Sequence, residues 1–165
     1  MSPAFALCLC VTALVALPVG AAERLDDSTS PRARVSPPVV LSDEGRPLAD
    51  SLNPRAITAK VGWVHYRLAT ARYVGKQARI YYVIPPNIPG LRSPAGLQIS
   101  WTTNGPWASG TARPGERRLV WAGTVRDPWV QAEFDITLGA SLRDLQLPAD
   151  GRLGFEPYFE IEASP

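Results

Sequence analysis

Apolar and polar residues alternate along most of the chain from residue 56 onward. In residues 130–138 every even position is apolar, from Val130 to Leu138, and every odd position is polar, from Gln131 to Thr137. Residues 153–163 show a similar pattern. A period of two places successive side chains on opposite faces of a strand. Strict alternation is typical of antiparallel sheets that have one buried face and one solvated face.

The first strand of this region contains a change of phase. Its apolar side chains occupy odd positions from Ile57 to Trp63 and even positions from Val64 to Leu68. A shift of one residue inside a strand is what a β-bulge produces, and Gly62 is a suitable position for one. We therefore predict a bulged strand here.

Further strands are predicted at residues 77–84, 96–102 and 117–125, separated by segments rich in proline and glycine. In the last of these strands, Leu119 and Trp121 lie at alternate positions and are expected to face inward. Short strands divided by such turns predict an all-β fold, an antiparallel β-sandwich of about seven strands with an immunoglobulin-like arrangement. A small barrel is the alternative. We assign this domain to residues 56–165.

The N-terminus has the features of a signal peptide. Residues 1–22 contain no charged side chain, and an apolar run is broken by Pro18 before the small residues Val19 and Ala21. We predict a cleaved signal peptide over residues 1–22 and no integral membrane span after processing. A retained membrane anchor is the alternative. Both cysteines lie in this segment, so the mature chain is expected to form no disulfide.

Residues 23–55 are rich in proline, serine and acidic residues. Such a composition buries too little apolar surface to offset the entropy lost on ordering. We predict a flexible Pro-rich N-terminal arm over this range, part of which can dock as an edge strand.

Composition and motifs argue against several classes of function. The chain has 17 Lys and Arg against 15 Asp and Glu, without long runs of like charge, so no nucleic-acid partner is expected. His65 is the only histidine. We expect no catalytic residues, no metal site and no cofactor. The carboxylate pairs Glu133/Asp135 and Glu160/Glu162 have a spacing that a hydrolase could use, and we keep that as an alternative.

The five tryptophans divide into two groups. Trp63, Trp101 and Trp121 fall within predicted strands, and we interpret them as core residues. Trp107 lies in a loop of turn residues, and Trp129 follows a turn at the start of a strand. These two either cap the ends of the sandwich or bind a ligand. The tentative binding residues are Trp107 and Trp129, with Arg113, Arg117 and Arg118 as a polar rim.

These observations predict an exported, non-enzymatic β-sandwich module, periplasmic or secreted, that binds a protein partner or a cell-envelope polymer. The prediction rests partly on fold analogy. One alternative is a structural subunit or accessory protein of a surface fibre or pilus. The carboxylate-dependent hydrolase is the other. The sequence does not indicate the oligomeric state.

Overall fold

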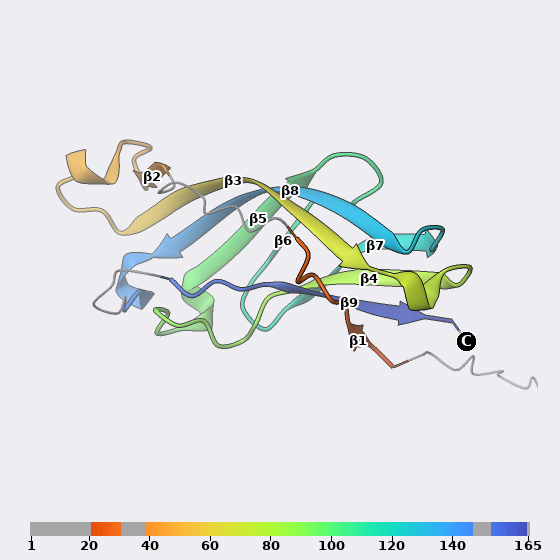
Figure 1. Ribbon diagram of the computed structural model, residues 1–165. Coiled ribbons are helices and arrows are strands. Elements are labelled where there is room, and N and C mark those ends of the chain that lie inside the picture. Colours follow the sequence, from red (N-terminus) through yellow and green to blue (C-terminus); the bar gives the residue numbers. More distant parts are fainter. Residues whose placement is uncertain (1–20, 31–38, 147–152, 165) are drawn as a thin grey trace, which may run out of the picture.

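The protein is a β-sandwich of two antiparallel sheets (Figure 1). The computed structural model describes residues 21–30, 39–146 and 153–164. In these ranges there are nine strands and no α-helix, so the predicted all-β sandwich is confirmed, with more strands than the seven expected. The four-stranded sheet has the order β1 (Glu23–Arg24), β9 (Tyr158–Ala163), β4 (Gln77–Val83), β7 (Arg117–Thr124). The five-stranded sheet has the order β2 (Val39–Ser42), β3 (Ala56–Ala69), β8 (Trp129–Ser141), β5 (Leu97–Thr103), β6 (Gly110–Ala112).

Aromatic rings from both sheets fill the space between them. Phe134 in β8 and Phe159 in β9 are fully buried, and their ring centroids lie 5.7 Å apart in an edge-to-face arrangement. Tyr82 of β4 lies 5.0 Å from Phe134 and 5.1 Å from Phe159. Trp101 of β5 is also buried, as predicted. Edge-to-face pairs add to the stability gained from burying the ring area itself. The alternation in β8 and β9 thus produces the core.

The bulge predicted in β3 is present. Lys60 lies opposite Thr137, whereas Gly62 lies opposite Ile136, so the register shifts between these two positions. Gly62 has a φ of 85°, a conformation that a residue with a Cβ rarely adopts. The expectation that Trp63 belongs to the core is wrong, because its side chain is 45% exposed. The bulge precedes Trp63 and places it on the solvated parity of the second half of β3.

A second irregularity occurs in β7. Ile80 lies opposite Trp121 and Tyr81 lies opposite Leu119, which leaves Val120 as an extra residue. Val120 is buried, and Leu119 is 49% exposed. The prediction that Leu119 faces inward is therefore wrong, because the extra residue reverses the parity at this point.

The two open edges of the sandwich are crossed by chain segments that bond to both sheets. At one edge, the backbone N–H of Leu25 donates to Phe159 of β9, and that of Ala69 in β3 donates to Asp26. Leu25 is buried. At the other edge, Ala108 donates to Val120 of β7 through a backbone bond of 2.8 Å. The sheets are therefore connected along both sides.

Two short parts of the segment predicted as an arm are paired into the sheets. Strand β1 pairs with β9, and β2 pairs with β3. Most of the predicted signal peptide, residues 1–20, and the middle of the arm, residues 31–38, lie outside the described residues. Within the ranges that the structure describes, no helix is long and apolar enough to cross a bilayer.

Candidate binding face

The outer side of the five-stranded sheet presents a line of mostly polar and aromatic side chains on two neighbouring strands. We call this surface the β3–β8 face. The register of β3 shifts at the Gly62 bulge, and from there to Ala69 the strand pairs with β8 without interruption. From the bulge onward, four cross-strand pairs form its rows: Trp63 opposite Asp135, His65 opposite Glu133, Arg67 opposite Gln131, and Ala69 opposite Trp129.

The alternation of burial shows which side these residues occupy. Tyr66 and Leu68 in β3, and Ala132 and Phe134 in β8, are buried between the sheets. Because successive side chains of a strand point to opposite faces, the intervening odd-numbered residues of both strands face away from the core. The β3–β8 face is therefore the solvated side of the sheet.

A tryptophan stands at each end of this face. Trp63 is 45% exposed and Trp129 is 37% exposed. Trp63 pairs with Asp135, which is six positions from Trp129 along β8, so the two tryptophans are about 20 Å apart along the strand. The guanidinium of Arg67 lies 4.7 Å from the ring centroid of Trp129, in cation–π geometry. Trp63 has no comparable contact among the described residues.

Charges of opposite sign lie on the two strands, in neighbouring rows and not directly opposite one another. Lys60 and Arg67 are on β3, and Glu133 and Asp135 are on β8. The Nδ1 atom of His65 lies 3.2 Å from a carboxylate oxygen of Glu133, and both side chains are exposed. Lys60 precedes the bulge and lies outside the four rows. When it is counted and His65 is left aside, two cations and two anions balance on this side of β3 and β8, whereas the four rows alone hold one cation and two anions.

The face is hollowed at its middle rows, on the side of β3. One hollow of about 300 Å³ has Thr29, His65 and Gln131 in its lining. A second, of about 460 Å³, is lined in part by Asp27, His65 and Glu156. His65 lines both hollows. It therefore lies beside the segment of residues 25–30, which closes this edge of the sandwich.

Of the residues singled out from the sequence, Trp107 lies inside the molecule. It is 7% exposed, and its ring packs against Phe134 and Trp121 at centroid distances of 6.2 and 6.4 Å. Its indole N–H donates to the backbone oxygen of Gln131 at 2.9 Å. Trp107 therefore does not form a surface patch with Trp129, and the tentative assignment of Trp107 as a binding residue is wrong. Trp107 supports β8 from the core side, and only Trp129 is available to a ligand.

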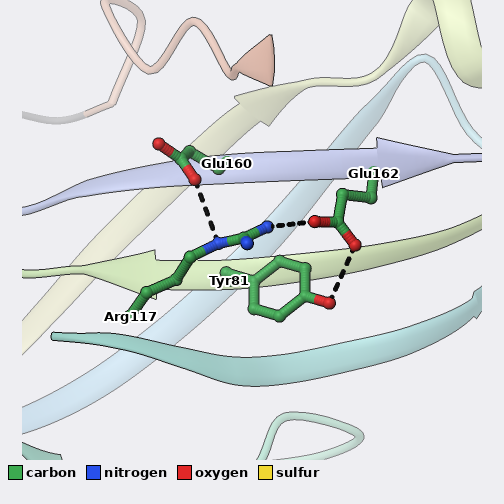
Figure 2. A network of polar contacts seen from close by, with 4 residues as sticks. All are labelled: Tyr81, Arg117, Glu160 and Glu162. Carbon is green, nitrogen blue, oxygen red and sulfur yellow. Dashed lines mark hydrogen bonds and ion pairs between the residues drawn. The ribbon is translucent and has the colours of Figure 1, made fainter. Parts of the chain in front are cut away.

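Arg117 belongs to the other sheet, where it joins a polar network (Figure 2). Its guanidinium lies 3.6 Å from the ring centroid of Tyr81 and forms ion pairs with Glu160 at 3.0 Å and Glu162 at 2.6 Å. The Tyr81 hydroxyl donates to Glu162 at 2.9 Å. The hydrogen bond from Arg117 lowers the pKa of the Glu162 carboxyl. A glycosidase general acid needs a raised pKa, so Glu162 is unsuited to that role.

Arg113 and Arg118 form a local cluster with Glu116. The Arg118 guanidinium pairs with Glu116 at 2.9 Å and donates to the backbone oxygen of Thr111 at 3.1 Å. The backbone N–H of Arg113 donates to the same carboxylate at 3.0 Å. The prediction that these arginines form a polar rim around an exposed Trp107 is therefore wrong. They hold the turn between β6 and β7.

Trp63 is the residue that sequence reasoning missed. The signal was present in the pattern. The buried side chains of this half of the strand, such as Tyr66, occupy even positions, so Trp63 at an odd position belongs to the polar set.

Among residues 21–30, 39–146 and 153–164, no three His, Cys, Asp or Glu side chains are grouped so that they could hold a metal ion. Comparison with family models, curated proteins and solved structures found no match.

Proposed function

We propose that the protein is a non-enzymatic binding module whose ligand lies on the β3–β8 face. The observation that carries this proposal is the exposure of Trp63 and Trp129 on one side of one sheet. Large aromatic side chains on an otherwise polar surface are typical of binding sites, since tryptophan supplies much of the free energy at recognition surfaces. A sheet face that only needs to be solvated requires no tryptophan.

We also propose that the module acts outside the cytoplasm, in the periplasm or after secretion. The support is the uncharged apolar segment at residues 1–22 and the absence of cysteine from the rest of the sequence. The immunoglobulin-like strand arrangement stays a prediction. The proposed partner is a protein or an envelope polymer, and the β3–β8 face is the surface that would contact it.

Comparison of tryptophan variants tests the proposal. The protein is expressed from the full chain, and its binding to solubilised envelope proteins and to insoluble envelope polymers is measured. Trp63→Ala and Trp129→Ala are expected to weaken binding at least about tenfold. Leu119→Ala is the matched control, because Leu119 is at least as exposed as the two tryptophans but belongs to the four-stranded sheet. The proposal fails if wild-type protein binds neither fraction, or if both tryptophan variants bind as wild type does.

A further inference from the structure

We infer that the ligand of the β3–β8 face is an uncharged polysaccharide, an inference that rests on the proposed function and names its ligand class. The first argument is electrostatic. Arg67 on the face and Lys60, just before the bulge, together balance Glu133 and Asp135 on the neighbouring strand. A polyanion would meet the two carboxylates, and a polycation would meet the two basic side chains. A neutral ligand avoids repulsion over the whole face, whereas a polymer of one charge sign does not.

The second argument is the row of side chains that passes through Trp63. Asp135 lies opposite Trp63 in β8, and Thr102 lies opposite Asp135 in β5. Adjacent strands are about 4.8 Å apart, so the indole, the carboxylate and the hydroxyl lie within about 10 Å of one another. Among the described residues, none of these three side chains has a hydrogen-bond or ion-pair partner. Their polar atoms are therefore available to a ligand.

This combination of groups matches the chemistry of a sugar ring. One face of a pyranose presents C–H groups, which pack against the flat indole of Trp63, and its edge carries hydroxyl groups. The Asp135 carboxylate accepts hydrogen bonds from those hydroxyls, and the Thr102 hydroxyl can donate or accept. Hydrogen bonds to an ionised carboxylate are stronger than those between neutral groups. The row thus provides stacking and directional recognition for one sugar unit.

The third argument is the length of the face. Trp129 lies about 20 Å from Trp63 along β8, which is farther than one sugar ring can reach. Arg67 stacks on Trp129 and limits the freedom of its ring, while the Gln131 amide adds a donor and an acceptor between the two ends. An extended chain of sugars lying along the strands contacts both tryptophans at once. The face therefore fits a polymer better than a monosaccharide.

A protein partner fits this surface less well. The centre of a protein–protein interface is depleted of charged residues and rich in contiguous apolar area. Here His65, Glu133 and Arg67 occupy the centre, and the two tryptophans are separated by them. Burial of these charges under a protein would require a matching partner for each one. A polysaccharide leaves much of the polar row in contact with water.

Calorimetric titration of the full chain with defined oligosaccharides tests the inference. The probes are uncharged hexasaccharides of glucose, mannose, galactose and N-acetylglucosamine, with hexagalacturonate as the acidic comparison. At least one uncharged hexamer is expected to bind, and hexagalacturonate at least about tenfold more weakly. Trp63→Ala is expected to weaken binding of the uncharged hexamer about tenfold or more. Trp63→Phe should retain most of it, and Leu119→Ala should have no effect.

The outcomes separate this inference from the proposed function. The polysaccharide class is overturned if no uncharged hexamer binds, or if hexagalacturonate binds more tightly. If Trp63→Ala then still loses binding to envelope material, the proposed function stands with another ligand class. If Trp63→Ala and Trp129→Ala keep all binding, both proposals fail. Thermal unfolding of each variant shows that it is folded, and these exposed substitutions should leave the midpoint of unfolding nearly unchanged.

Discussion

Trp107 is held in the core by both packing and a hydrogen bond. It touches the rings of Phe134 and Phe159, and its indole N–H reaches the backbone oxygen of Gln131. Truncation to alanine leaves a cavity and an unpaired backbone acceptor. We expect Trp107→Ala to lower the free energy of unfolding by about 3–5 kcal/mol in denaturant titrations. Leu119→Ala, on the surface, should cost about 0.5 kcal/mol or less. A Trp107→Ala protein as stable as wild type would contradict the assignment to the core.

The tryptophans show what a sequence pattern can and cannot predict about single residues. Trp101 follows the parity of its strand and is buried, as expected. Trp107 lies in a loop, where no period exists to indicate its side, and its burial depends on contacts with strands distant in sequence. Trp63 lies next to a phase shift and ends the odd-numbered apolar run from Ile57, so it was predicted as a core residue although a bulge at Gly62 moves it to the solvated parity. The candidate site was therefore predicted only at Trp129.

At the scale of strands, the bulge at Gly62 determines which residues of β3 reach the solvent. Gly62 has a φ of 85°, and no atom approaches the position that a Cβ would take. The cost of a side chain there is conformational strain, not a clash. We expect Gly62→Ala to lower the free energy of unfolding by about 1–2 kcal/mol.

The matched control for that substitution is Gly139→Ala on β8. A Cβ at Gly139 would make only an ordinary contact, 3.8 Å from the backbone oxygen of Gln98. Gly139→Ala should therefore leave the denaturation midpoint nearly unchanged. Equal effects of the two substitutions would show that Gly62 is not required by its backbone conformation. Loss of ligand binding in Gly62→Ala, without unfolding, would further link the bulge to the display of Trp63.

The Arg117 network joins β7 to β9 across β4 and makes stability depend on pH. The hydrogen bond from Arg117 lowers the pKa of Glu162 in the folded protein. The stabilisation is therefore complete above the ordinary glutamate pKa of about 4.3 and is lost as the pH falls through the lowered value. We expect Arg117→Gln to lower the free energy of unfolding by about 1–2 kcal/mol at pH 7. The difference from wild type should shrink as the pH falls below about 4.

Arg46→Gln provides the comparison for that experiment. Arg46 forms an ion pair with Glu44, but both side chains are more than half exposed. Exposed single pairs contribute little, so this substitution should change the free energy of unfolding by about 0.5 kcal/mol or less. Urea denaturation at pH 3 to pH 8 measures both variants. A difference between Arg117→Gln and wild type that grows toward acid pH would contradict the assigned role of Glu162.

At the scale of the whole molecule, alternation predicts the layers but not how their edges are connected. The buried parities of β8 and β9 indicate two sheets with a common core. The segment of residues 25–30 crosses one edge through single backbone bonds to Phe159 and Ala69. Such bonds involve partners more than 40 positions away. A short polar segment held by them shows no alternation of apolar and polar residues from which the pairing could be predicted. This is why residues 23–55 were predicted as an arm without any assigned pairing.

The edges also bear on whether the molecule polymerises, as a subunit of a fibre would. Exposed edge strands invite pairing with another chain unless they are short, bulged or charged. Among the described edge strands, β1 and β6 have two and three residues, and β7 has a bulge at Val120 and begins with Arg117 and Arg118. We therefore expect the processed protein to sediment as a single monomeric species over a wide range of concentrations. A ladder of multimers on native gels would instead favour the fibre subunit. In that case β2, whose Val39 is 63% exposed, is the edge strand to test first, by substituting a lysine at that position.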